Sequence, residues 1–267
     1  MGGNRVEKRL LELRRQKRLQ TLLGVALALA LVIVSSVRTR FTPYTVFQGV
    51  GEMFKFVVND FLPPDLSTLN ELLGPALDTI YMSYIGMVIG AAVSVVLAFL
   101  AAQTTAPHRG VQVATRAFAS VMRNIPTIIW AIVLVAAYGL GTLVGTLALI
   151  ITAIGTLTRA YAEILEEIDM GQVEAVRATG ASYFQVLGQA VVPQFFPGFV
   201  AWSLYKLELN VRSSTIIGMV GGGGLGFVIQ KGLKLFQFKE VSLAVILVLL
   251  LVAGTEFVTS KIRERIL

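Results

Sequence analysis

The sequence has no cysteine and only one histidine, His108, among its 267 residues. The absence of cysteine excludes disulfide bonds and thiolate-bound metals, and a single histidine argues against a zinc or haem site. Charged residues are also scarce, at 15% of the chain, whereas a soluble domain carries about a quarter. With 55% hydrophobic residues and a mean hydropathy of +0.74, the composition is that of a polytopic membrane protein.

The net charge and one missing motif each exclude a class of function. The net charge of +7 indicates orientation in a membrane, with basic segments in the cytoplasm, and we expect no nucleic-acid partner. The sequence also lacks the pattern G-x-x-x-x-G-K-[ST], so the chain cannot bind and hydrolyse ATP through a P-loop. We therefore expect no enzyme activity and no cofactor bound by this chain.

The apolar runs predict an all-α membrane protein with six transmembrane helices and both termini in the cytoplasm. We divide the chain into a basic N-terminus (1–18), a first transmembrane helix (19–37), an outer segment (38–77) and a five-helix core (78–267). The small residues at Ala26–Ala28 would also fit a signal-peptide cleavage site. Because the apolar run continues to Val37, a transmembrane helix is the better interpretation.

The outer segment contains one amphipathic stripe. Phe47, Val50, Phe54, Val57 and Phe61 recur at spacings of three and four, which predicts a helix with one apolar face. Pro63-Pro64 should end this helix. We expect it to lie on the membrane surface or against the bundle, and the alternative is a docking site for a partner.

Within the core we expect a span over 79–102, a fifth span over 195–217 and a sixth over 241–260. Between them, residues 125–158 should form a tight hairpin of two helices that turns near Tyr138–Gly145 on the outer side. Gly86 and Gly90 should let another helix approach the span over 79–102 closely. The stretch from His108 to Arg123 is predicted to be a basic cytoplasmic loop. Basic residues are usually concentrated in cytoplasmic loops, but lysines 231, 234 and 239 fall on the predicted outer side. They therefore suggest an anionic ligand.

The polar residues away from the chain ends concentrate in two places. The first, over 164–193, is here named the coupling segment, and we expect a helix, a sharp turn at Gly180 and a second helix. Since most connections are about 4–6 residues long, a structured polar stretch of this size indicates a docking surface for a cytoplasmic partner. An ordinary connecting loop is the alternative.

The second polar region lies in the fifth span. Lys206, Glu208, Asn210 and Arg212 interrupt an otherwise apolar helix, and charges at membrane depth normally face a partner or an aqueous path. Glu208 and Arg212 are spaced to pair with each other, either structurally or along the path. Lys206 has no acid at such a spacing and is our candidate for lining an anion's route, although snorkelling or pairing with another helix would also explain it.

Residues 213–230, here named the glycine-rich segment, follow directly. Irregular backbone at membrane depth is tolerated only beside protein or water, so we predict a re-entrant outer gate whose exposed amides could bind an oxyanion. Because no βαβ unit precedes the G-x-G-x-x-G pattern within it, we reject a dinucleotide site. Gate and path residues are predicted to be Lys206, Glu208, Asn210, Arg212, Ser213, Ser214, Gly221, Gly222, Gly223, Gly224 and Gly226.

The coupling segment resembles the EAA signature of ABC importer permeases. Glu174-Ala175-Val176, Gly180 and Pro193 stand at the spacing of that signature, and the departures at positions 176, 190 and 192 are apolar exchanges. The resemblance implies the small type I ABC importer permease fold with cytoplasmic coupling helices. It also implies contact with an ATPase subunit, which would hold the ATP and Mg, through Glu174, Ala175, Arg177, Gly180 and Ala181.

The resemblance extends to phosphonate importer permeases, which belong to the methionine-importer-like group. It is carried by EEID-x-G-x-VEA-x-RATGAS, QFFPGF, LNVRSSTIIGMVGGGGLGF, PPDLS and RNIPTIIWA, which cover about half of the chain. It implies a homodimer in a bacterial cytoplasmic membrane, two ATPase subunits and an extracytoplasmic phosphonate-binding protein. The alternatives are an importer of phosphite, phosphate, methionine or another small solute, and a secondary transporter.

Overall fold

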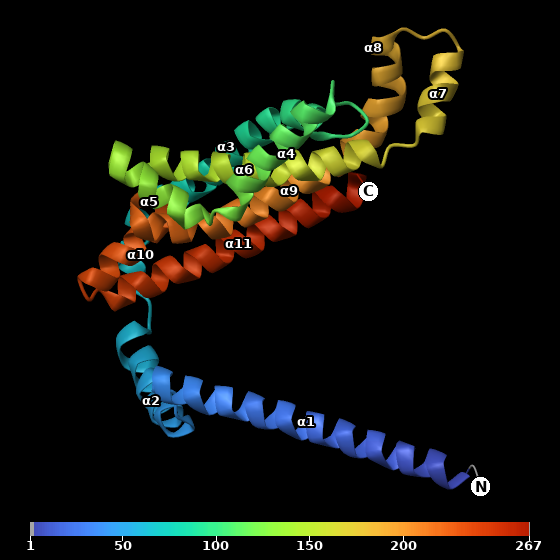
Figure 1. The fold of residues 1–267 in the computed structure, drawn as a ribbon. Helices are drawn as coiled ribbons and strands as arrows, with labels where there is room; N and C mark the ends of the chain where they lie inside the picture. The colour runs from blue at the N-terminus through green and yellow to red at the C-terminus, as the bar shows by residue number, and fades with distance from the viewer. Residues whose placement is uncertain (1–2, 267) are drawn as a thin grey trace. The chain divides into compact units, whose positions relative to one another are not determined.

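The computed structural model describes the backbone of residues 3–266 and the side chains of residues 14–42 and 44–266. Every regular element between residues 3 and 266 is helical (Figure 1). The chain forms two compact units, residues 1–60 and residues 61–267. We describe each unit by itself.

The first unit contains α1 (Gly3–Thr39) and α2 (Pro43–Phe56). Helix α1 begins well before the predicted apolar run because the preceding Leu, Glu, Arg, Lys and Gln residues all favour helix. The hydroxyl of Thr42 caps α2 by accepting from the amide of Thr45 at 3.2 Å. A π-helical turn, η1 (Val57–Phe61), continues α2, so the predicted amphipathic stripe lies on helix and ends before Pro63.

The second unit is organised around α3 (Leu69–Ala101) and α6 (Thr142–Glu166), which pack along each other. A Cβ on Gly90 would lie 2.4 Å from Cβ of Ala153, and one on Gly86 would lie 2.8 Å from Cβ of Leu149. The predicted close approach at Gly86 and Gly90 is therefore confirmed. A 3-10 turn, η2 (Leu66–Thr68), precedes α3, and Asp65 caps it; hydrogen bonds from Ser67 lower the pKa of Asp65.

The predicted basic loop is wrong, because most of it is helix α4 (Arg109–Asn124). Its arginines recur at helical spacing, and His108 caps it by accepting from the amides of Gly110 and Val111 at 3.1 and 3.3 Å. Helix α5 (Thr127–Tyr138) follows after a bend of 85°. The predicted hairpin turn before α6 is confirmed at Gly139 and Gly141, whose φ angles are +84° and +145°.

The remaining long helices are α9 (Val192–Ile217), α10 (Gly224–Lys234) and α11 (Phe238–Ile266). Within the described residues, four helices are long and apolar enough to cross a membrane, and six spans result if each of two bent helix pairs crosses once. The upper count equals the predicted six. Two of the three lysines predicted to lie on the outer side, Lys231 and Lys234, are in the last turn of α10, where a cation is favoured by the helix dipole.

Candidate functional site

The coupling segment forms the predicted helix, turn and helix. Helix α7 (Met170–Ala178) starts at Asp169, whose carboxylate accepts from the amide of Gly171 at 2.8 Å. Gly180 has a φ of +82°, a conformation that glycine adopts without the cost of a Cβ. After it come α8 (Tyr183–Val186) and the π-helical turn η3 (Leu187–Val191), which leads into α9. Figure 1 shows α7 and α8 projecting beyond the neighbouring ends of α6 and α9.

A small core holds this hairpin together. Val173, Val186 and Ala190 are buried against one another, at 4–6% exposure, while Glu174, Ala175, Arg177 and Gly180 are exposed and Ala181 is half-buried. The predicted coupling residues therefore lie mainly on the outward face of a rigid hairpin. Exposed charged side chains on such a face are available to a partner protein, whereas the apolar side chains pack against one another inside the hairpin.

A cleft of about 270 Å³ opens between this hairpin and the ends of α3 and α6. Its lining includes Thr104, Leu165, Met170, Arg177 and Tyr183. Tyr183 is exposed, as is its neighbour Phe184. The hairpin therefore presents aromatic rings together with Met170 and Arg177, which are residue types that protein interfaces favour.

The charges of α9 do not pair as predicted. Glu208 accepts hydrogen bonds from Arg263 at 2.6 Å and from the hydroxyl of Thr259, and Arg212 pairs with Glu256 at 3.1 Å. The predicted Glu208–Arg212 pair is therefore wrong, because α11 supplies a partner to each of them. The prediction from sequence missed these three residues of α11, which are Glu256, Thr259 and Arg263. The one available signal of a partner was Glu256, an acid within an apolar run.

Lys206 and Asn210 lie one turn apart on α9, and both are buried, at 6% and 0% exposure. The amide nitrogen of Asn210 donates to the carbonyl of Ser83 on α3 at 3.1 Å, and its oxygen has no partner among the described atoms. No acidic side chain described by the structure forms an ion pair with Lys206. The interior of the bundle therefore contains a cation without a counterion.

The glycine-rich segment is broken and packed, as predicted for irregular backbone at membrane depth. Residues Gly218–Gly222 form a π-helical turn, η4, and the chain bends by 53° into α10. Gly221 accepts from the amide of Gly141 at 2.9 Å, and the hydroxyl of Thr79 accepts from the amide of Leu225 at 3.0 Å. Helix α3 and the turn before α6 thus hold the segment in place.

Close packing explains the glycines themselves. A Cβ on Gly226 would lie 1.9 Å from the carbonyl oxygen of Thr215, and one on Gly145 would lie 2.3 Å from that of Gly222. Gly221, Gly222, Gly224 and Gly226 are buried, and Gly223 is half-buried. The expectation of exposed amides is therefore wrong for the four buried glycines, because other helices cover them. Of the two predicted serines, Ser214 is buried and donates to the carbonyl of Val211 at 2.7 Å, and Ser213 is half-buried.

Comparison with known proteins agrees with this architecture. The family model for "binding-protein-dependent transport system inner membrane component" matches residues 94–265. The phosphite transport system permease protein PtxC of Stutzerimonas stutzeri is 38% identical over 208 residues, which are 78% of this chain and 76% of that protein. The phosphate-import permease protein PhnE of Mycolicibacterium smegmatis is 36% identical over 88% of this chain, although the chain spans only 44% of its length.

Among solved structures, the fold is similar to a chain of the MetNI methionine ABC transporter in inward-facing conformations. The TM-score is 0.66 at 21% sequence identity, over 76% of this chain and 99% of that chain. The predicted permease fold and the resemblance to permeases of phosphorus-oxyanion importers are both confirmed. The family match at residues 94–265 covers the coupling segment, α9 and the glycine-rich segment together.

Proposed function

The chain belongs to the family of binding-protein-dependent transport system inner membrane components, and we propose that it is the permease subunit of an ATP-driven importer for a phosphorus oxyanion. Its relatives are named as phosphite and phosphate permeases, and this pair of relatives is the observation that carries the substrate class. Phosphonate, phosphite and phosphate share a tetrahedral phosphorus with charged oxygens. An importer for methionine is the second candidate, because the fold is that of a methionine transporter chain.

We propose that the coupling segment transmits the ATPase cycle. Two ABC ATPase subunits, which bind the ATP and Mg, would each grip one hairpin through Glu174, Ala175, Arg177, Gly180 and Ala181. Support comes from the exposure of the charged residues and from the buried core of the hairpin. A rigid hairpin transmits a displacement as a lever, whereas a flexible loop would absorb it.

The proposed assembly is a homodimer in a bacterial cytoplasmic membrane, with both termini in the cytoplasm and an extracytoplasmic phosphonate-binding protein delivering substrate. We assign six spans to each copy. The five glycines Gly221, Gly222, Gly223, Gly224 and Gly226 form the outer gate, and Lys206, Glu208, Asn210, Arg212, Ser213 and Ser214 lie on or beside the path. The counterion-free Lys206 supports an anionic substrate, since a passing anion would neutralise it.

The test is made on the complex reconstituted with its own ATPase and binding protein. ATP hydrolysis is measured with 2-aminoethylphosphonate, phosphite, phosphate and methionine in turn. We expect a phosphorus oxyanion to stimulate hydrolysis. Stimulation by methionine alone would leave the importer standing and reject the proposed substrate class.

A further inference from the structure

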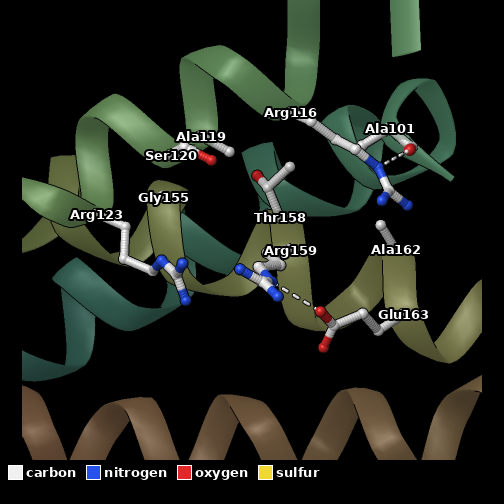
Figure 2. Close-up of a pocket in the computed structure, with 10 residues that line it drawn as sticks. All are labelled: Ala101, Arg116, Ala119, Ser120, Arg123, Gly155, Thr158, Arg159, Ala162 and Glu163. Carbon is white, nitrogen blue, oxygen red and sulfur yellow. Dashed lines mark hydrogen bonds and ion pairs between the residues drawn. The ribbon is translucent and has the colours of Figure 1, made fainter. Parts of the chain in front are cut away.

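A cationic pocket of about 210 Å³ lies between α4 and α6, apart from the coupling segment and the glycine-rich segment (Figure 2). Three arginines line it, Arg116 and Arg123 from α4 and Arg159 from α6, and Glu163 is its one acidic lining residue. The lining therefore carries a formal charge of +2. A volume of this size admits a small oxyanion together with several waters, since one water takes about 30 Å³ in the liquid.

The three arginines differ in the hydrogen-bond and ion-pair partners that they have. Arg116 donates to the carbonyl of Ala101 at 2.8 Å and to Glu166 at 2.5 Å, and Arg159 donates to Glu163 at 2.7 Å. Arg123 has no acidic partner among the side chains that the structure describes. Figure 2 shows its side chain reaching from α4 toward Arg159 on α6. Because Glu163 pairs with Arg159 alone among the described residues, the two neighbouring guanidinium groups carry an excess positive charge that favours an added anion.

A second observation points to a ligand at the same place. Thr158 lines the pocket, is fully buried, and its hydroxyl has no hydrogen-bond partner among the described atoms. A buried hydroxyl without a partner costs free energy, so a missing acceptor is expected beside it. Ser120 adds another hydroxyl to the lining.

Close packing fixes the backbone at Arg123, whose exposed side chain lines the pocket. A Cβ on Gly155 of α6 would lie 2.7 Å from the backbone nitrogen of Arg123 and 3.0 Å from the carbonyl oxygen of Ala119. Helix α4 therefore crosses α6 at backbone contact, and the arginine extends from that crossing. A site built on two packed helices fixes the points from which its donor side chains extend.

We propose that this pocket binds a tetrahedral phosphorus oxyanion, held by Arg123 and Arg159 and by the hydroxyl of Thr158. Arg159 lies about 26 Å along α6 from its first residue at 1.5 Å per residue, which in the proposed orientation is the cytoplasmic end of the bundle. The ligand is either a free anion in the cytoplasm or the phosphate of an anionic lipid headgroup. The choice of phosphorus over other oxyanions rests on the proposed function.

The test uses the full-length permease in nanodiscs of neutral phosphatidylcholine, titrated with inorganic phosphate and with methylphosphonate. Binding is followed by calorimetry and by phosphorus NMR. We expect Arg123→Gln and Thr158→Val each to weaken binding, by about 10- to 100-fold for the arginine. Arg109→Gln, on the same helix but outside this pocket, is the matched control and should bind as the wild type does.

Thr158→Val also separates a ligand-binding role from a structural one. Because it removes a buried hydroxyl with no partner, the variant should keep or raise the Tm of the empty permease while it loses affinity. Equal affinity in the wild type, Arg123→Gln and Thr158→Val would overturn the proposal.

Nanodiscs containing phosphatidylglycerol distinguish the two sources. If the headgroup occupies the pocket, the apparent affinity for phosphate falls in these discs, and the retained lipid is lost in Arg123→Gln. If a free anion is the ligand, the affinity is unchanged once salt screens the negative surface potential of the lipid. Absence of phosphate binding in every disc, without lipid retention that depends on Arg123, would overturn the proposal.

Different assays test the proposed pocket and the proposed function. A reconstituted complex that no phosphorus oxyanion stimulates overturns the proposed function, whereas the nanodisc titration still decides whether the pocket binds phosphate. A complex that imports a phosphorus oxyanion while the two variants bind as the wild type does overturns only the pocket.

Discussion

Arg263 on α11 donates a hydrogen bond of 2.6 Å to the carboxylate of Glu208 on α9. The side chain of Glu208 is only 12% exposed and that of Arg263 is 34% exposed. Thr259, one turn before Arg263, donates to the same carboxylate oxygen. Glu208 is therefore tied to the last helix by two donors, and α9 cannot slide along α11 without breaking them.

We expect Glu208→Gln to destabilise the permease by about 1–3 kcal/mol. The substitution keeps the shape of the side chain but leaves Arg263 partly buried without a counterion, and its Nε already has no partner among the described atoms. The measurement is the Tm of the purified chain. A double-mutant cycle with Arg263→Gln should show coupling between the two residues.

The neighbouring pair of Arg212 and Glu256 supplies the control. These side chains are 51% and 57% exposed, and exposed ion pairs contribute about 0–1 kcal/mol. Arg212→Gln should therefore change the Tm much less than Glu208→Gln does. Equal losses in the two variants would show that burial does not set the strength of these pairs.

The predicted features that follow from local pattern agree with the structure. The apolar stripe from Phe47 to Phe61 lies on helix, and the turn of the coupling segment is at Gly180. Gly86 and Gly90 allow α6 to pack closely on α3. Each depends on residues a few positions apart, whose spacing is visible in the sequence. Helix propensity extends such elements past the predicted ends, as at α3, which begins at Leu69 and not near Thr79.

The features that depend on distant residues could not be predicted in the same way. Arg212 has an acid at helical spacing, yet it pairs with Glu256 from another helix, because the packing of α9 on α11 decides which charges meet. The basic composition of the stretch after His108 predicts a loop, because arginines dominate it. Their spacing around one helix face, which places Arg116 and Arg123 against α6, was the signal that α4 exists.

Gly90→Ala should lower the stability of the core by about 1–3 kcal/mol, because the added methyl group would overlap Cβ of Ala153 and force α3 away from α6. Gly254→Ala on α11 is the matched control, since a Cβ there meets nothing within 4 Å. That substitution should be neutral or stabilising, because alanine favours helix over glycine. The measurement is Tm, and opposite signs for the two variants are expected.

Gly180→Ala should weaken coupling while it leaves membrane insertion intact. The φ of +82° at this position costs an L residue about 1 kcal/mol, although a Cβ there would meet no atom within 4 Å. Uptake and co-purification of the ATPase should both fall, and Gly180→Asn should lose less, since asparagine tolerates this conformation. Gly188→Ala, with no contact within 4 Å and no positive φ, should behave as the wild type.

Glu174→Lys tests the docking face directly. Glu174 is exposed on α7, so reversing its charge should not disturb the buried core of the hairpin. We expect normal membrane insertion, loss of the co-purifying ATPase and loss of uptake. Glu264→Lys, which reverses an exposed acid on α11 outside the coupling segment, is the control; a defect of the same size in both variants would point to general electrostatics and not to a docking face.

The final prediction concerns Lys206, the buried cation of α9. Lys206→Met removes the charge and keeps an unbranched side chain, so it removes the cost of holding an uncompensated cation at 6% exposure. If Lys206 serves the passing anion, the Tm should be unchanged or higher while uptake falls by about tenfold or more. Lys206→Arg, which keeps the charge, should retain more uptake than Lys206→Met.

Leu207→Met, on the next position of α9, reports the effect of a methionine in this helix without a change of charge. We expect it to transport as the wild type does. Parallel losses of assembly, Tm and uptake in Lys206→Met would show instead that the lysine holds the bundle together. Removal of a structural cation lowers the Tm, whereas removal of a path-lining cation leaves the Tm unchanged or raises it, so a fall in Tm decides between the two roles.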